Sequence, residues 1–346
     1  MNKINVKTSH PYEVLIERGA VDSCGKYISE ITSSRKAVII TDDIVGGLYG
    51  ERVTNSLKES GFECSTFTFP NGEHSKNISV LGDIFDFLCD ASITRSDILI
   101  ALGGGVVGDI TGFAAASYLR GIDFVQIPTT LLAQIDSSVG GKTAIDIKGG
   151  KNLVGAFKQP SLVICDSDTL KTLPREVLAD GMAEAIKYGM IRDEQLFELI
   201  ESHNLDTIDT VMDKMVYTCI DIKRDVVEND EFDRGERMIL NFGHTLGHAL
   251  EGWHNYTDYT HGMGVAAGMC MITDMLAPQL SGRLKKCVCA YELPVGTDIP
   301  MSELLPFCSK DKKRESDKLS YIICNTIGKA EIKKVTVAEF SELMGE

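Results

Sequence analysis

Short apolar runs alternate with helix-like segments in the first half of the chain, and this alternation restricts the fold more than any other feature. Five runs have the composition of buried strands: residues 36–41, 62–69, 97–102, 123–127 and 161–165. Between the second and third runs, apolar residues recur at the spacing of one helix face: Ile78, Leu81, Ile84, Phe85 and Leu88. Alternating strands and helices predict βαβ units and an α/β, Rossmann-like domain with a parallel sheet.

The second half of the chain follows a different period. From Pro174 to about Pro278 the apolar spacing is helical, and residues 319–324 and 330–335 predict a short β pair around Gly328. At roughly 150 residues per domain, 346 residues suggest two domains. We expect an α/β domain over residues 1–172 and a mainly α-helical domain over 173–346. A site shared by both would lie in the cleft between them.

Charge and composition exclude several classes of protein. Fifty acidic residues against 35 basic ones leave a net charge of −15, which argues against a nucleic-acid or anionic-membrane binder. The apolar runs fall well short of the roughly 18 residues that a membrane span needs. The first residues lack the apolar core of a signal peptide, so we expect a cytoplasmic protein. The ten cysteines show no metal-type pairs, and we expect most to be small core residues.

A glycine-rich loop follows the third apolar run. Residues 103–109 are Gly-Gly-Gly-Val-Val-Gly-Asp, a literal GxGxxG, and a helical pattern comes next. Glycines let backbone N–H groups approach a pyrophosphate, so we predict a nucleotide site; a tightly packed turn is the alternative. For the ribose-binding acid, Asp42 at the end of a strand is better placed than Asp123. The polar turn 70–76 also follows a strand, and its spacing favours neither a site nor a plain turn.

A polar stripe marks the segment 237–251. Four polar residues follow one another at spacings of 4, 3 and 4, which is one face of a helix: Arg237, Asn241, His244 and His248. Two histidines four residues apart can share a metal ion, and Glu184 or His261 could add a ligand. The glutamate of HExxH is missing, which argues against a zincin protease. Ordinary histidines with satisfied hydrogen bonds are the alternative.

Several cations lie in glycine-rich or apolar surroundings: Arg120, Lys142, Lys151, Lys187, Lys223 and Arg237. Any one of them alone would be an ordinary solvated side chain. As a set in an acidic protein, they predict a site for an anionic, phosphorylated substrate.

The chain resembles the 3-dehydroquinate synthase family from about residue 10 to residue 335. The resemblance is carried by the turn 70–76 and by five further segments: 103–115 (GGGVVGDITGFAA), 118–121, 126–157 (QIPTTLLAQIDSSVGGKTAIDIKGGKNLVGAF), 181–189 and 240–251. It implies a homodimeric enzyme of the shikimate pathway, a carbon–oxygen lyase that converts 3-deoxy-D-arabino-heptulosonate 7-phosphate to 3-dehydroquinate and phosphate. It also implies NAD and a divalent metal, Zn²⁺ or Co²⁺, as cofactors.

The resemblance assigns residues to each part of the site. The metal ligands are Glu184, His244 and His261, whereas spacing alone would have favoured His248. The substrate would contact Asp136, Lys142, Asn152, Lys187, Lys223, Arg237, Asn241 and His248, together with Lys312 and with Arg120 reaching into the neighbouring subunit. Among these, the implied catalytic residues are Lys142, Lys187, Lys223, Arg237, Asn241 and His248. The NAD site would include Asp42, Asn71, Gly72, Glu73, His74, Ser75, Lys76, Gly105, Val106, Val107, Gly108, Asp109, Thr129, Thr130, Lys142, Lys151, Thr169, Leu170, Lys171 and Thr172.

The chain departs from the family's usual pattern at three positions. Asp233 replaces a glutamate, Glu236 replaces an apolar residue, and Met263 replaces a glutamate beside His261. Three other functions compete. The first is a related cyclase acting on sedoheptulose 7-phosphate or glucose 6-phosphate, the second a metal-dependent polyol dehydrogenase, and the third a non-catalytic binding protein. Residues that suit a substrate carboxylate favour the dehydroquinate reaction: Lys142, Arg237 and Asn241.

Overall fold

The computed structural model describes residues 1–255, 259–308 and 318–343, and the chain divides into two compact units. Unit 1 comprises residues 1–173 together with 223–232, and unit 2 comprises 174–222 together with 233–346. None of the helices in the described ranges combines the length and apolar composition needed to cross a membrane.

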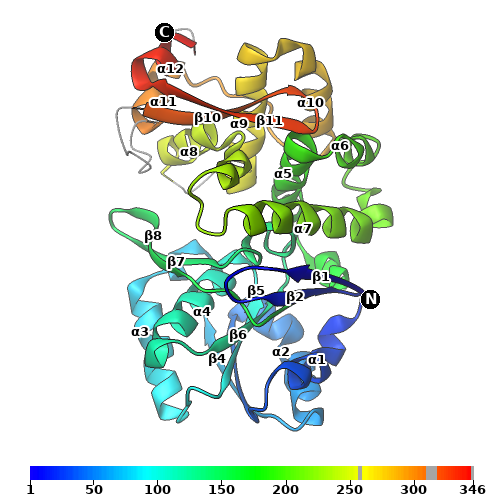
Figure 1. Cartoon of the computed structure of the whole chain (residues 1–346), viewed down its shortest axis with the longest axis vertical. Helices are drawn as coiled ribbons and strands as arrows, with labels where there is room; N and C mark the ends of the chain where they lie inside the picture. The colour runs from blue at the N-terminus through cyan, green and yellow to red at the C-terminus, as the bar shows by residue number, and fades with distance from the viewer. Residues whose placement is uncertain (256–258, 309–317, 344–346) are drawn as a thin grey trace. The chain divides into compact units, whose positions relative to one another are not determined.

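Unit 1 is built on a seven-stranded sheet in the order β1-β2-β9-β6-β5-β3-β4 (Figure 1). All neighbouring strands are parallel except β1 and β2. The five predicted runs form five of the strands: β3 (Lys36–Asp42), β4 (Glu63–Phe69), β5 (Ile98–Gly103), β6 (Asp123–Pro128) and β9 (Leu162–Cys165). The strands β1 (Asn2–Val6) and β2 (Tyr12–Ile16) were not predicted. The α/β class and the parallel sheet are confirmed.

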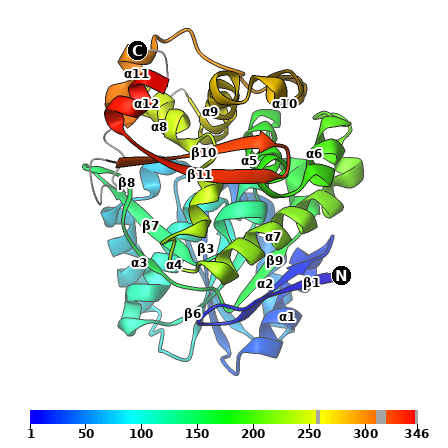
Figure 2. The same ribbon diagram turned by 45° about the horizontal axis from the view of Figure 1, so that its top comes forward.

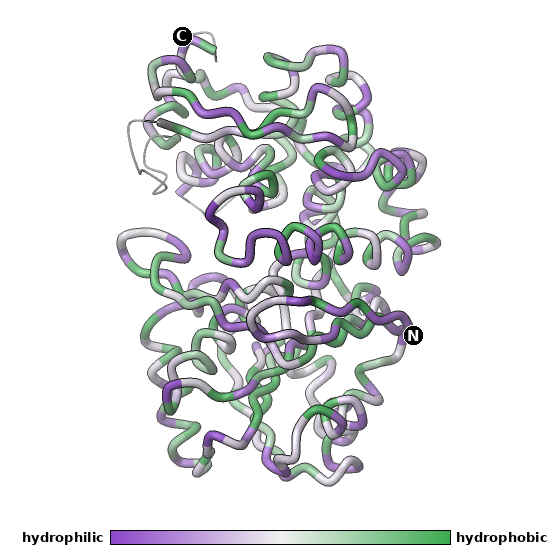
Figure 3. The backbone as a smooth tube through the Cα atoms, in the orientation of Figure 1, coloured by the Kyte–Doolittle hydropathy of each residue, from purple (hydrophilic) through white to green (hydrophobic). Residues whose placement is uncertain are grey.

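Helices cover both faces of this sheet (Figure 1). One face packs against α1 (Cys24–Ile31) and α2 (Asp43–Glu59), and the other against α3 (Ile78–Asp90) and α4 (Gly105–Ser117). Because side chains alternate along a strand, Ile39 joins the core of the first face, whereas Val38 and Ile40 join the second. The apolar colouring of these central strands in Figure 3 agrees with burial on both faces.

Short elements complete unit 1. The strands β7 (Lys142–Ile147) and β8 (Gly150–Phe157) form a separate antiparallel hairpin, and β7 packs on α4. Five short helices complete the unit: the 3₁₀ helices η1 (Ala20–Ser23), η2 (Glu73–Ser75), η3 (Tyr118–Arg120) and η5 (Ser167–Thr172), and the π-helix η4 (Ala133–Ser137).

Unit 2 is mainly helical, as predicted. Its helices are α5 (Arg175–Arg192), α6 (Glu194–Glu201), α7 (Met212–Asn229, of which the part from Lys223 on belongs to unit 1), α8 (His244–Trp253), α9 (His261–Leu276), α10 (Pro278–Ala290), α11 (Met301–Cys308) and α12 (Val337–Leu343), with η6 (Ile208–Val211) and η7 (Glu236–Asn241). The strands β10 (Lys318–Thr326) and β11 (Lys329–Thr336) run side by side in Figure 2. Gly328 turns between them at φ 82°, so the predicted β pair is confirmed.

The continuous helix predicted over 237–251 is wrong. Residues Glu236–Asn241 form the 3₁₀ helix η7, and α8 begins only at His244. Gly243 separates them with φ 81°, a left-handed conformation that glycine adopts without strain. Arg237 and Asn241 therefore do not share a helix face with the two histidines of α8.

Glycines bring α8 and α9 into direct backbone contact. A Cβ added to Gly268 would lie 2.1 Å from the carbonyl oxygen of Gly243, and one added to Gly247 would lie 2.7 Å from the carbonyl carbon of Gly264. Real Cβ atoms do not approach backbone this closely, so the two helices could not pack this way with any larger residue. This packing holds the first residue of α8, His244, beside the first residue of α9, His261: their ring centroids are 5.2 Å apart.

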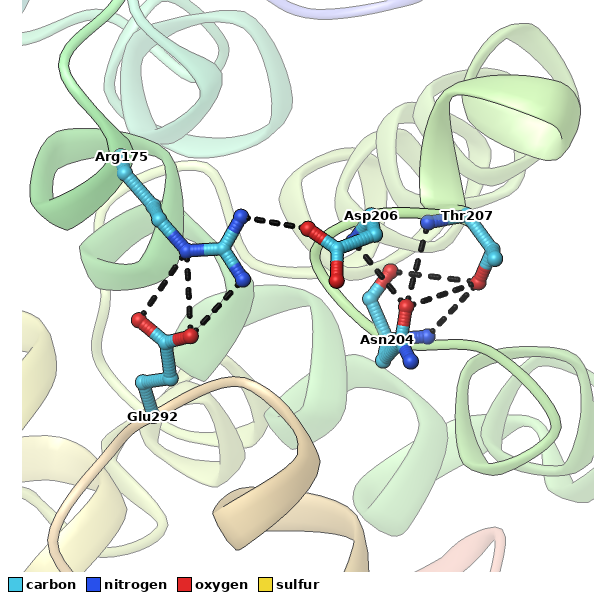
Figure 4. Close-up of polar contacts among 5 residues, drawn as sticks. All are labelled: Arg175, Asn204, Asp206, Thr207 and Glu292. Carbon is cyan, nitrogen blue, oxygen red and sulfur yellow. Dashed lines mark hydrogen bonds and ion pairs between the residues drawn. The ribbon is translucent and has the colours of Figure 1, made fainter.

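The start of α5 is held by a polar network (Figure 4). Arg175 donates to Asp206 at 2.6 Å and to Glu292 at 2.7 Å, so one guanidinium joins the loop after α6 to the residues after α10. Asn204 Oδ1 accepts from the backbone N–H groups of Asp206 and Thr207 and closes the loop. The network fixes the N-terminus of the helix that carries Glu184 and Lys187.

Candidate active site

Three helices of unit 2 converge on one cluster of metal-binding side chains. Glu184 of α5 places Oε1 3.3 Å from Nε2 of His261 and 3.5 Å from Nε2 of His244. One ligand atom from each of the three lies within 4.8 Å of the other two. One carboxylate oxygen and two imidazole nitrogens, with room for a further ligand, form a donor set typical of Zn²⁺ or Co²⁺. The residues present therefore fit the divalent metal that the resemblance implies.

The environment of this cluster is strongly polar although it is buried. Glu184 is fully buried, and its Oε2 forms an ion pair with the ammonium of Lys187, itself 1% exposed. Burial lowers the pKa of His244 well below 6.5, which favours the neutral imidazole that binds metals. Burial alone would lower the pKa of His261 too, but hydrogen bonds with Glu184 and Glu251 outweigh it and raise the pKa to about 10.

The N-terminus of α9 is capped so that His261 has a fixed position. Asp180 Oδ1 accepts from the N–H of Gly262 at 2.6 Å, and Thr260 Oγ1 accepts from the N–H of Met263. Met263, one of the three departures, thus takes part in the cap through its backbone. Neither capping residue was identified from the sequence, although a threonine before a predicted helix is a recognisable signal.

Arg237 and Asn241 lie on η7, and Arg237 is 2% exposed. Glu236 on the same short helix forms an ion pair with Arg192 at the end of α5. The departure at position 236 therefore has a partner in this chain, and the pair joins η7 to the helix of Glu184 and Lys187. His248 lies on the exposed side of α8, with its ring centroid 5.3 Å from that of His244.

In unit 1 the glycine-rich loop joins β5 to α4. Gly104 precedes the first turn of α4 and has no side chain that could cap it, a geometry typical of anion sites at helix N-termini. Two motif glycines also serve packing: a Cβ at Gly103 would lie 2.4 Å from Val107, and one at Gly108 would lie 2.6 Å from Gln126. The phosphate site and the tightly packed turn are therefore compatible with each other.

The polar turn 70–76 is joined to this loop through Lys76. Its ammonium lies 2.6 Å from Asp109 Oδ2 and 2.6 Å from Asn152 Oδ1, and Glu73 is 3.7 Å away. Burial lowers the pKa of Lys76, but Asp109 and Glu73 outweigh this effect and raise it, so the side chain stays charged. The structure thus brings together two residues assigned to NAD, Lys76 and Asp109, and one assigned to the substrate, Asn152.

The two acids considered for the ribose lie at opposite ends of their strands. Asp42 ends β3 and also caps α2, since its Oδ1 accepts from the N–H groups of Ile44 and Val45. Asp123 begins β6, opposite Ile98 rather than Gly103. It therefore lies away from the glycine loop, and of the two only Asp42 is at the carboxyl edge.

The other candidate NAD residues lie in loops of unit 1. Val106 and Val107 are in the first turn of α4, and Asn71, Gly72, Glu73, His74 and Ser75 lead into Lys76. Thr129 donates its N–H to Gly103, and its buried Oγ1 has no hydrogen-bond partner among the described residues. The hydroxyl groups of three further candidates, Thr130, Thr169 and Thr172, form hydrogen bonds within the protein, with Ala133, Asp166 and Tyr49 respectively. Leu170 is buried in η5, and exposed Lys171 pairs with Asp168.

The remaining substrate candidates are dispersed over unit 1. Lys223 forms an ion pair with Asp136. Lys142, assigned to both the substrate and NAD, is exposed at the start of β7, and Lys151, assigned to NAD, lies on β8. Arg120 is exposed beside Gly121, with φ 68°. Lys312 lies outside the described residues.

Comparison with solved structures identifies the fold. A 2-deoxy-scyllo-inosose synthase complexed with carbaglucose-6-phosphate, NAD⁺ and Co²⁺ superposes with a TM-score of 0.87 at 23% identity, over 99% of both chains. A 2-epi-5-epi-valiolone synthase from Streptomyces hygroscopicus with NAD⁺ and Zn²⁺ bound also gives 0.87 at 23% identity, over 99% of this chain and 98% of the other. The chain therefore has the fold of the sugar-phosphate cyclases.

Sequence comparison narrows the class to one family. Residues 66–180 match the 3-dehydroquinate synthase N-terminal family model, and residues 181–314 match the C-terminal one. The 3-dehydroquinate synthase of Clostridium acetobutylicum is 47% identical over 338 residues, covering 95% of this chain and 94% of the relative. The chain belongs to the 3-dehydroquinate synthase family, and the resemblance seen in the sequence is confirmed.

Proposed function

We propose that this chain is a 3-dehydroquinate synthase of the shikimate pathway, acting in the cytoplasm as a carbon–oxygen lyase. Its substrate would be 3-deoxy-D-arabino-heptulosonate 7-phosphate and its products 3-dehydroquinate and phosphate, with NAD and Zn²⁺ or Co²⁺ as cofactors. The observation that carries the proposal is the convergence of Glu184, His244 and His261 from three helices, in a chain that belongs to this family.

The cofactors would supply the chemistry that side chains lack. When bound at the three ligands, a divalent ion supplies Lewis-acid polarisation of substrate hydroxyl groups. When bound at the glycine loop, NAD supplies reversible hydride transfer at carbon 5. Lys187 holds Glu184 through the oxygen that does not face the histidines, and the caps at Gly262 and Met263 orient His261.

The reaction starts from a transient ketone at carbon 5. This ketone acidifies the proton on the neighbouring carbon, so that proton and the phosphate group leave by β-elimination. The carbonyl at carbon 5 is then reduced again, the ring opens, and an intramolecular aldol step closes the carbocycle. The oxidation and the reduction at carbon 5 cancel, so the reaction would need NAD⁺ as a cofactor but no net oxidant.

The cations of the chain suit a substrate with two anionic groups. Lys187, Lys223 and Arg237 are buried. Lys187 forms an ion pair with Glu184, and Lys223 forms one with Asp136. We assign Lys142, Arg237 and Asn241 to the substrate carboxylate and Arg120 and Lys312 to its phosphate. His248, the exposed histidine of α8, would hold a proton near the phosphate. Preorganised charges of this kind hold one conformer of a flexible sugar acid.

The competing functions differ in what they require. Sedoheptulose 7-phosphate and glucose 6-phosphate lack the carboxylate that these residues suit, and the two cyclase structures described above each share only 23% identity with this chain. A polyol dehydrogenase would release NADH, and a binding protein would have no use for a cofactor that cycles. The dehydroquinate reaction uses every part of the site.

The deciding experiment is phosphate release from 3-deoxy-D-arabino-heptulosonate 7-phosphate, with and without NAD⁺ and with and without a chelator, while absorbance at the NADH band is followed. We expect release that needs both cofactors, with no net NADH. Release only from the other two sugar phosphates would assign a different cyclase activity. NADH that accumulates with a simple polyol would assign a dehydrogenase and contradict the proposal.

A further inference from the structure

Both histidines of the metal cluster have their second ring nitrogen held by an acceptor. Nδ1 of His244 lies 3.2 Å from the carbonyl oxygen of Phe242, and Nδ1 of His261 lies 3.4 Å from Oε2 of Glu251. The opposite nitrogen, Nε2, faces Glu184 in both rings. A carbonyl and an ionised carboxylate can only accept, so each Nδ1 carries a hydrogen. Nε2 of His261 also faces a carboxylate, that of Glu184, so a metal ion bound at this nitrogen would replace the proton shared with Glu184 and leave Nδ1–H donated to Glu251.

We propose that Glu251 is a positioning residue for the metal site: it accepts the Nδ1–H of His261 and so fixes this ligand's tautomer and ring orientation. The inference rests on the proposed metal site. Glu251 lies seven residues after His244, on the same face of α8, and only 4% of it is exposed. A carboxylate hydrogen-bonded behind a metal-bound imidazole raises the basicity of that ligand.

Of the two histidines in the cluster, the local packing places His261 within hydrogen-bond distance of Glu251 and directs His244 elsewhere. His244 is on the same helix, and its Nδ1 is directed to the turn before α8, at Phe242. His261 comes from α9, which the glycines 243, 247, 264 and 268 bring against α8. The backbone contact between α8 and α9 that brings His244 beside His261 therefore also places Glu251 beside His261.

A second role for Glu251 has to be weighed. His248, Glu251 and His261 also form a group whose ligand atoms lie within 4.8 Å of one another, so Glu251 could bind a second ion. In that arrangement His261 would bind one ion through each nitrogen and would have to lose both ring protons. With one ion bound at Nε2, the ring gives up only the proton of that nitrogen and keeps Nδ1–H donated to Glu251, so the geometry favours one ion and an outer carboxylate.

The test compares Co²⁺ binding by the metal-depleted full-length protein and by Glu251→Gln, which keeps the side-chain shape but removes the charge. We expect one equivalent in both, a dissociation constant about 10–100-fold weaker in the variant, and a shifted Co²⁺ absorption spectrum. Glu251→Leu, which removes the acceptor as well, should bind more weakly still. The matched control is Glu303→Gln: Glu303 accepts from the indole of Trp253 at 3.1 Å, and its variant should bind Co²⁺ like the wild type.

The outcomes separate the possible roles. An unchanged affinity and spectrum in Glu251→Gln would overturn the inference, and so would two equivalents in the wild type with one lost in the variant. A wild type that binds no Co²⁺ would contradict the metal site of the proposed function itself. A measurement that needs no variant of Glu251 is ¹⁵N NMR of histidine-labelled, Zn²⁺-loaded protein. The histidine signal that is present in the wild type and absent from His261→Gln belongs to His261. This signal should show the Nδ1–H tautomer, and an Nε2–H tautomer would refute the inference.

Discussion

Among single residues, the buried ion pair of Glu184 and Lys187 carries an energetic prediction. Removing one partner of a buried pair leaves an uncompensated charge, so Lys187→Met should lower the free energy of unfolding of the metal-free protein by about 3–5 kcal/mol. Lys285→Met is the matched control, because both side chains of its 2.6 Å pair with Asp274 are 37% exposed and the pair should be worth about 0–1 kcal/mol. Denaturant unfolding measures both. Equal losses in the two variants would show that the buried pair has no special weight.

Asp97 gives a prediction about pH. Its carboxylate accepts from Ser34 at 2.9 Å and from the N–H and hydroxyl of Thr94 at 2.8 Å each. Burial raises the pKa of Asp97, but these hydrogen bonds outweigh it and lower the pKa below 3.8. The unfolded chain therefore takes up the proton first. The stabilisation is present above about pH 4 and is lost as pH falls through the folded-state pKa.

The test of this prediction is Asp97→Asn. The variant should lose about 1.5–3 kcal/mol of stability at pH 7, the usual worth of hydrogen bonds to a charged group. The difference from the wild type should shrink below about pH 4. Asp83→Asn, an exposed change on α3, should stay within about 0.5 kcal/mol at every pH. A loss that does not depend on pH would assign the effect to packing rather than to the charge.

Between elements, the glycine contact of α8 and α9 decides whether the metal ligands meet. Gly268→Ala would place a methyl group 2.1 Å from the carbonyl oxygen of Gly243, so the helices must separate. We expect the variant to lose both thermal stability and Co²⁺ affinity. In Gly282→Ala, the added methyl meets nothing within 4 Å on an exposed turn of α10, and the variant should gain about 0.4–1 kcal/mol. A Gly268 variant with normal metal affinity would show that the contact is not required.

Some elements could be predicted from the sequence because burial of a helix face or a strand requires apolar residues at a characteristic spacing. The central strands β3, β5 and β6 each contain a run of buried apolar residues, and α3 buries Leu81, Ile84 and Leu88 as its spacing predicts, although Ile78 at its start is exposed. The strand β8 could not be found in this way, since most of its residues are exposed and the burial pattern does not alternate along it. The break at Gly243 was missed because it arises from packing against α9, which no local pattern reports.

For the molecule as a whole, the candidate site depends on contacts between residues far apart in the chain. Spacing found His244 but favoured His248 as its companion, because i and i+4 neighbours are the only partners that a helical pattern reveals. Glu184 and His261 reach His244 through the packing of α5 and α9. The sequence pattern offered them only as possible further ligands, and the family resemblance assigned them. Likewise, the strand register showed that Asp123 lies away from the glycine loop.

The last prediction concerns the assembly. We expect a homodimer by light scattering, in which exposed Arg120 serves the phosphate site of the neighbouring subunit. Arg120→Ala and His244→Ala should each be inactive alone. If each subunit's Arg120 acts in its partner's site, a mixed dimer has one complete site, because the His244→Ala subunit supplies Arg120 to the subunit that retains His244. Half of the dimers in an equal, re-equilibrated mixture are mixed, so about a quarter of the wild-type activity should return. If Arg120 acts within its own subunit, no site in the mixture is complete, and the absence of recovery would contradict the assignment.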